Sequence, residues 1–146
     1  MLQQHIHGIL FINANFERRL KPLDMPSYSP EDLSTKERHQ ILLASVAPRP
    51  IALVSTVDEH GNHNLSPFSF FNIFSSNPPV LIFSAARRVR NNTTKDTLHN
   101  AMSQKQVVVN VVNYDMARQV NLSSAEYDSS VDEFVKSGLT PIPSDF

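Results

Sequence analysis

The residues best suited to chemistry in this sequence form a cluster of cations near its middle. Three arginines and one lysine fall within nine positions, at Arg87, Arg88, Arg90 and Lys95, and threonines stand between and beside them at Thr93, Thr94 and Thr97. Guanidinium forks, an ammonium group, hydroxyls and the N-terminus of a following helix are the components of a phosphate site. The pattern also leaves open a simpler interpretation, a basic loop that is only solvated.

A second candidate is a strand-like segment that contains a proline. It reads Asn64-Leu65-Ser66-Pro67-Phe68-Ser69-Phe70-Phe71-Asn72, with small polar residues on one face and apolar residues on the other. Proline removes one ladder donor, so backbone N–H and C=O groups nearby are available to the edge of a planar heterocycle. Aromatic and aliphatic side chains would cover the face of that ring. The alternative is an ordinary strand whose phenylalanines are buried in the core.

Arg49 is the third candidate, because a proline stands on each side of it. The two prolines hold its backbone extended. An arginine presented so rigidly suits an anion or a contact between subunits. The alternative is a solvent-facing arginine at a corner between a helix and a strand.

The composition excludes several other kinds of site. The three glycines, Gly8, Gly61 and Gly138, are far apart, so neither a G-x-G-x-x-G turn nor a Walker A loop exists. The absence of cysteine excludes iron–sulfur clusters, cysteine-ligated zinc, thiolate nucleophiles and disulfides. The histidines form no H-E-x-x-H motif, and no serine stands beside an obvious base, so we predict neither a metal site nor a catalytic side chain.

The elements that must position these candidates can be read from hydrophobic pattern and turn residues. The 146 residues suit one domain. Residues 1–28 look like an arm or extension, and a helix is expected from Ser29 to Ala44. Strands are expected at 51–57, 62–72, 80–84 and 106–112, and further helices from Thr93 or Thr94 to 102, at 115–125 and at 131–137. Hairpins with short helices between them predict a small β-barrel with helical decorations.

Charge and hydropathy give expectations about partners and location. The net charge of −1 does not point to nucleic acid or a membrane. The apolar run 6–12 is too short to span a bilayer and lacks a basic leader, so we expect a cytoplasmic protein.

Taken in order, these segments resemble the flavin reductase-like family, the FMN-binding split barrels. The resemblance rests on SVAPRPIALVST (45–56), NLSPFSFFN (64–72), NPP (77–79), KDTL (95–98), VVN (108–110) and DEF (132–134). It covers residues 29–146 and is nearest to the branch with reductase components of two-component monooxygenases and flavoredoxin-like proteins. Residues 1–28 have no counterpart that we recognise.

The resemblance implies a fold, a cofactor and a set of binding residues. The fold would be mainly β with short helices, an FMN-binding split β-barrel. FMN would be the cofactor and NAD(P)H the co-substrate of a flavin reductase, with no catalytic side chain and no metal. A homodimer and an electron acceptor such as a monooxygenase would be the partners. The implied cofactor-binding residues are Arg49, Thr56, Asn64, Leu65, Ser66, Pro67, Phe68, Ser69, Ser84, Arg88, Lys95, Asp96 and Thr97.

Two alternatives to an active reductase stay open at this stage. One is a module that holds FMN and passes electrons to a protein without NAD(P)H activity of its own. The other is a non-catalytic fragment, because family members continue beyond the segment that matches 139–144. We therefore expect the barrel to be incomplete here, and either open or completed by a partner, with unpaired strand edges if it is open.

Overall fold

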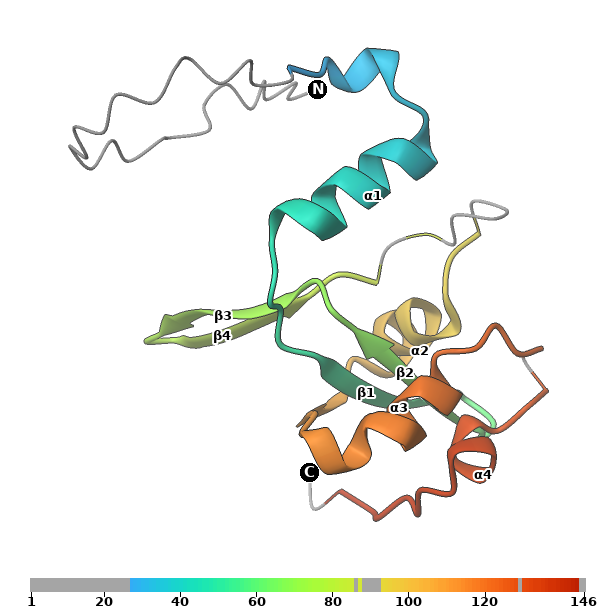
Figure 1. Ribbon diagram of the computed structural model, residues 1–146. Helices are drawn as coiled ribbons and strands as arrows, with labels where there is room; N and C mark the ends of the chain where they lie inside the picture. The colour runs from blue at the N-terminus through green and yellow to red at the C-terminus, as the bar shows by residue number, and fades with distance from the viewer. Residues whose placement is uncertain (1–26, 86, 88–92, 129, 145–146) are drawn as a thin grey trace.

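A computed structural model describes residues 27–85, 87, 93–128 and 130–144, and these ranges form strands with short helices between them (Figure 1). The strands β1, β2 and β5 make an antiparallel sheet in the order β2-β1-β5, and β3 and β4 make a separate antiparallel ribbon. The strands are β1 (Ala52–Val57), β2 (His63–Phe68), β3 (Phe71–Ser76), β4 (Pro79–Phe83) and β5 (Val108–Val111). The described strands do not close into a barrel.

Helices cover both faces of the three-stranded sheet. On one face Leu53 and Leu65 pack against Val120 of α3 (Ala117–Ser123) and Phe134 of α4 (Glu133–Ser137). On the other face Thr56 meets α2 (Asp96–Gln104), and the two sets of helices lie on opposite sides of the sheet in Figure 1. Because β1 is the central strand and is covered on both faces, its sequence is apolar at consecutive positions rather than at alternate ones.

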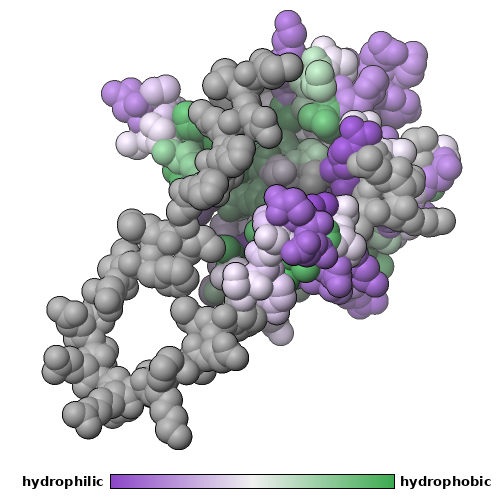
Figure 2. Space-filling view, turned by 90° about the horizontal axis from the view of Figure 1, so that it is seen from above, coloured by the Kyte–Doolittle hydropathy of each residue, from purple (hydrophilic) through white to green (hydrophobic). Residues whose placement is uncertain are grey.

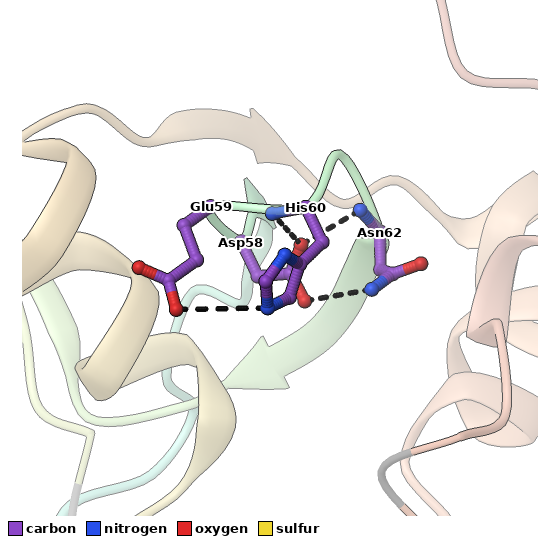
Figure 3. A network of polar contacts seen from close by, with 4 residues as sticks. All are labelled: Asp58, Glu59, His60 and Asn62. Carbon is purple, nitrogen blue, oxygen red and sulfur yellow. Dashed lines mark hydrogen bonds and ion pairs between the residues drawn. The ribbon is translucent and has the colours of Figure 1, made fainter.

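The turn between β1 and β2 fixes the register of the sheet. The Asp58 carboxylate accepts hydrogen bonds from the backbone N–H groups of His60 and Asn62, both at 2.8 Å, and from Asn62 Nδ2 at 2.8 Å (Figure 3). Gly61 adopts φ +85°, as expected for the turn. The resulting register places Pro67 opposite Leu53 in the edge strand β2, one of the positions that proline tolerates in a sheet.

The predicted strand 62–72 is wrong, because the chain forms two strands there. β2 ends at Phe68, the backbone turns at Ser69 and Phe70, and β3 starts at Phe71. Ser84 N donates to Phe70 O at 2.9 Å, so β3 leaves β1 and pairs with β4 instead. The loop predicted at 75–79 is shorter than expected, because β3 extends to Ser76 and β4 begins at Pro79.

Two helix starts also differ from the predictions. The segment after Ser29 is only a 3-10 turn, η1 (Pro30–Asp32), and α1 (Thr35–Ser45) starts later. Ser34 and Glu37 form a capping box at that later position, with Ser34 N donating to Glu37 Oε2 at 2.9 Å. Lys95, rather than Thr93 or Thr94, precedes α2 as its N-cap.

The last two predicted helices are present in shortened form. The segment 115–125 becomes a 3-10 turn, η2 (Tyr114–Met116), followed by α3. The helix predicted at 131–137 is α4, and Gly138 ends it in the left-handed conformation at φ +73°, as expected.

Two elements project from the sheet and its covering helices. None of the residues of α1 is buried, and the helix stands away from the sheet in Figure 1. The β3–β4 ribbon carries exposed Ile73, Phe74, Leu81 and Ile82. On the face seen in Figure 2, hydrophobic residues reach the surface between hydrophilic ones.

Several predictions fall on residues that the structure does not describe. These are most of the N-terminal arm, with its apolar run at 6–12, and the cations Arg88 and Arg90. No helix among the described residues is both long and apolar enough to cross a membrane.

Candidate functional site

A cleft of about 780 Å³ runs beside the edge strand β2. One wall is β2 itself with the turn that follows it, and another is the start of α2. One side of α1 and the segment 123–127 after α3 complete it. The cleft therefore lies where the proline-containing strand and the basic segment meet.

Nine of the thirteen residues predicted to bind the cofactor line this cleft. They are Asn64, Ser66, Pro67, Phe68, Ser69, Ser84, Lys95, Asp96 and Thr97. They come from β2, from the residue after β4 and from the start of α2, which are distant in the sequence. Arg87 of the basic cluster lines the cleft as well.

The other predicted residues have different positions. Leu65 is buried in the core, and only its backbone N–H is directed to a cleft residue, Glu133. Thr56 is buried behind Asn64 and does not line the cleft. Arg88 lies outside the described residues.

Arg49 holds the end of α1 rather than lining the cleft. Its Nη1 donates to the carbonyl oxygens of Leu43, at 2.6 Å, and of Val46, both near the C-terminus of that helix. Cationic side chains commonly satisfy the last carbonyls of a helix in this way. Its Nε also donates to Ser69 Oγ at 3.4 Å, and its guanidinium lies over the ring of Phe70 at 5.9 Å. Arg49 therefore fixes α1 to the turn after β2.

The start of α2 forms one end of the cleft, and this end carries a positively charged side chain, that of Lys95. Lys95 Nζ lies 4.9 Å from the centre of the Phe68 ring, and that ring packs against Phe83 at 5.2 Å between centroids. Lys95 stands at the N-terminus of α2, where the helix dipole adds positive potential. Arg87 lines the same cleft, and these two cationic side chains favour an anionic group of a ligand.

Four buried polar residues connect the cleft wall to the sheet behind it: Asn64 and Thr97 line the cleft, and Thr56 and Asn100 lie behind them. Asn64 Nδ2 donates to Thr97 Oγ1 at 2.9 Å and to Thr56 Oγ1 at 3.2 Å, and Asn100 Nδ2 also donates to Thr56 Oγ1 at 3.2 Å. All four are at least nine-tenths buried. The hydrogen bonds join β1, β2 and α2, so the strand wall and the cationic end of the cleft are held in one arrangement.

Glu133 contributes a carboxylate to the cleft from the first turn of α4. Its Oε2 accepts a hydrogen bond from Leu65 N at 3.1 Å. Burial raises the pKa of Glu133 above its ordinary value, and the negative charges of Asp96 and Asp132 act in the same direction. The hydrogen bond from Leu65 opposes that rise in pKa but does not cancel it.

Sequence reasoning missed two walls of the cleft. Thr35, His39 and Leu43 line it from α1, and His39 packs edge-on against Phe70 at 5.8 Å between ring centroids. Their spacing of four residues on a helix is a signal that could have placed them on one face. The segment Ser123, Ser124, Ala125, Glu126 and Tyr127 also lines the cleft, and it carries no pattern that points to binding.

The arrangement is suited to holding a ligand. Backbone groups beside Pro67, hydroxyls, aromatic rings and cations face one space. Among the described residues, no group of three or more histidines and acidic side chains could hold a metal ion. A cleft with an apolar side and a cationic end is complementary to a planar ring that carries a phosphate.

Comparison with known proteins identifies the family of this chain. The flavin reductase like domain family matches residues 44–146. An uncharacterized protein of Aquifex aeolicus is 42% identical over 108 residues, which are 74% of this chain and 55% of that protein.

Two solved structures share the fold. Nitrilotriacetate monooxygenase component B from Bacillus cereus superposes with a TM-score of 0.76 and 32% identity, over 83% of this chain and 59% of that one. A putative flavin reductase with a split barrel domain from Shewanella frigidimarina gives a TM-score of 0.65 and 30% identity, over 84% and 61%.

The chain belongs to the flavin reductase-like family, as the resemblance implied. Its fold is that of the split-barrel members, mainly strands with short helices between them. The chain spans about half the length of the curated relatives that it matches.

Proposed function

We propose that this chain binds FMN in the cleft beside β2 and catalyses the reduction of that flavin by NAD(P)H. The observation that carries the proposal is convergence: residues from β2, from the end of β4 and from the start of α2 line one cleft in a member of the flavin reductase-like family. No single motif in the sequence brings these segments together.

The chemistry of the cleft fits FMN. Its volume of about 780 Å³ lies within the range of cofactor-sized pockets. Phe68 and the backbone around Pro67 supply an apolar surface and peptide groups for a planar ring, whereas Lys95 and Arg87 supply cations for a phosphate. Three carboxylates, of Asp96, Glu126 and Glu133, line the cleft as well, so the positive charge is local to Lys95 and Arg87 and is not a net charge of the cleft.

FMN, when bound, supplies the redox chemistry by accepting a hydride from a nicotinamide. The chain then has to bind the phosphate, orient the ring along β2 and leave room for the nicotinamide. None of these tasks needs a side-chain acid or base. Lys95 and Arg87 would hold the phosphate, and the strand with Pro67 would set the plane of the ring.

Titration of the purified protein with FMN tests the binding step, followed by absorbance and by quenching of flavin fluorescence. Oxidation of NADH and NADPH at 340 nm, with added FMN, tests the reductase step. Saturable binding with flavin-dependent turnover is the expected result. Tight FMN binding without NAD(P)H oxidation would indicate an electron-transfer module instead of a reductase. A folded protein that binds no FMN would contradict the proposal.

A homodimer that delivers electrons to an acceptor such as a monooxygenase is the second part of this proposal. It is supported by the exposed apolar side chains of the β3–β4 ribbon, where Ile73 lies opposite Leu81. The name of the Bacillus cereus neighbour, a monooxygenase component, agrees with such an acceptor. Light scattering of the wild type and of the double variant Ile73→Ser/Leu81→Ser tests the dimer, and identical masses for both would contradict this role of the ribbon.

A further inference from the structure

The cleft runs along the free edge of β2. The strand lies at the edge of the three-stranded sheet, with β1 on its other side. The cleft is lined from both faces of that sheet, because the start of α2 comes from one face and Glu133 of α4 comes from the other. The outward backbone groups of β2 therefore face the space that a ligand in the cleft would occupy.

The hydrogen-bond ladder with β1 determines which backbone groups of β2 point outward. Asp58 N donates to Asn62 O at 3.0 Å, so these two residues form a hydrogen-bonded pair. In an antiparallel ladder such pairs alternate with non-hydrogen-bonded ones, and the register is continuous from this pair along β2. The even-numbered residues of β2 therefore bond to β1, whereas Leu65 and Pro67 turn their backbone groups outward. The hydrogen bond from Leu65 N to Glu133, at 3.1 Å, agrees with this assignment because α4 lies outside the ladder.

The outward edge of β2 has no free backbone donor at Leu65 or Pro67. Proline has no N–H, and the N–H of Leu65 already donates to Glu133 Oε2. The outward carbonyl oxygens of the same two residues remain, and no described residue donates to them. Pro67 and Glu133 both line the cleft. This part of the edge therefore presents a carbonyl and a carboxylate to the cleft, and both are acceptors.

We propose that Glu133 is a specificity-determining residue: by occupying the N–H of Leu65 beside Pro67, it leaves this edge of β2 with acceptors only, so that a ligand ring meets the edge through an N–H group. This inference rests on the proposed function for the identity of the ligand, FMN. The oxidised isoalloxazine has a single N–H, which lies in its imide between two carbonyl groups. A ring without that N–H would place acceptors against acceptors, and a buried acceptor without a donor costs free energy.

Substitutions at Glu133 separate this role from a merely stabilising one. Glu133→Ala releases the Leu65 N–H as a donor, whereas Glu133→Gln removes the charge and keeps an acceptor for that N–H. Asp132→Asn is the matched control, because it removes the adjacent negative charge and an asparagine still caps α4 at Phe134 N. Should Glu133→Ala fail to fold, Pro67→Ala introduces an N–H at the other outward position.

The first readout needs no flavin. In the ligand-free protein at neutral pH, NMR follows hydrogen exchange of the Leu65 backbone N–H with water. We expect Glu133→Ala to accelerate this exchange about tenfold, and Glu133→Gln and Asp132→Asn to stay close to the wild-type rate. An unchanged rate in Glu133→Ala would overturn the proposal, because Glu133 would then not withhold this donor.

The second readout compares the dissociation constants for FMN and for 3-methyl-FMN, in which a methyl group replaces the imide hydrogen. We expect the wild type to bind 3-methyl-FMN about tenfold more weakly than FMN. Glu133→Ala should bind 3-methyl-FMN more tightly than the wild type does and reduce this ratio to about threefold, because a ring carbonyl can then accept from Leu65 N. In Glu133→Gln and Asp132→Asn the ratio should stay at the wild-type value.

The outcomes distinguish this inference from the proposed function. Equal affinities of the wild type for the two flavins would overturn the donor selectivity and leave FMN binding in place. The wild-type ratio in Glu133→Ala would mean that the added methyl group only clashes, and it would overturn the role of Glu133. If the wild type binds no FMN, the proposed function fails, while the exchange rate at Leu65 still decides whether Glu133 withholds the donor.

Discussion

Replacement of Glu133 tests how the cleft side of α4 is held against β2. The carboxylate accepts from Leu65 N at 3.1 Å, is partly buried, and lies near the negative charges of Asp96 and Asp132. Glu133→Gln keeps an acceptor for Leu65 N and removes the charge. Glu133→Ala removes both the charge and the acceptor.

The expected sizes follow from the hydrogen bond and its exposure. A hydrogen bond to a charged acceptor contributes about 1.5–3 kcal/mol, and partial exposure lets water replace some of it. We therefore expect Glu133→Ala to lower the free energy of unfolding by about 1–2 kcal/mol. Glu133→Gln should stay within about 1 kcal/mol of wild type at neutral pH, because Leu65 N keeps a partner.

The pH dependence distinguishes the two contributions of Glu133. Its pKa is raised above 4.5 in the folded protein, so between 4.5 and the folded pKa the folded state binds more protons than the unfolded state. The contribution of Glu133 to stability is therefore largest at low pH and falls as pH rises through this window. The free energy of unfolding of Glu133→Gln, minus that of wild type, should increase with pH from 4.5 and become constant above the folded pKa.

Urea unfolding at a series of pH values from 4 to 8 measures this difference. The pKa values of Glu37, Asp58 and Asp128 are lowered by hydrogen bonds, so their contributions are lost only as pH falls below their ordinary range. They are common to both proteins and cancel in the difference. A difference that is flat, or that decreases with pH, would refute a raised pKa at Glu133.

Three further substitutions test separate parts of the structure. Lys95→Ala should weaken FMN binding by about 1.5–3 kcal/mol through loss of a charged contact, measured by fluorescence titration; an unchanged affinity would remove Lys95 from the phosphate end. Asp58→Ala should lower the midpoint of urea unfolding, because three hydrogen bonds of the β1–β2 turn in Figure 3 lose their acceptor; an unchanged midpoint would contradict a stabilising role of this turn. Leu53→Ala should cost about 2–5 kcal/mol by the same assay, since its side chain is 2% exposed in the core; a cost under about 1 kcal/mol would contradict that packing.

The parts of the fold that local chemistry determines could be predicted from the sequence. The apolar run at 51–57 predicted β1, Gly61 predicted the turn that follows β1, and Gly138 predicted the end of α4. The structure has each of these features. The predicted helix start at Ser29 was wrong because two serines, Ser29 and Ser34, each precede acidic residues within three positions. Only Ser34 has Glu37 three residues further on, which completes a capping box.

The parts that depend on distant contacts could not be predicted in the same way. The break after Phe68 depends on the pairing of β3 with β4, which no local pattern in 62–72 reveals. The sequence left an anion as a possible partner of the Arg49 guanidinium. In the structure the guanidinium donates instead to carbonyl oxygens at the end of α1, and the position of that helix could not be predicted from the sequence. The contribution of 123–127 to the cleft likewise arises from tertiary packing alone.

The two faces of β1 explain how a polar site can rest on a small apolar core. Leu53 points to α3 and α4 and packs with Leu65, so changes on that face act on stability. On the opposite face the strand passes from Ala52 and Val54, packed around Phe68, to Thr56, which holds the amides. Because successive side chains of a strand alternate between faces, one short strand serves both tasks without mixing them. Substitutions on the two faces of β1 should therefore differ in kind: those that face Leu65 disturb the apolar core, and those at Thr56 disturb the buried hydrogen bonds to Asn64 and Asn100.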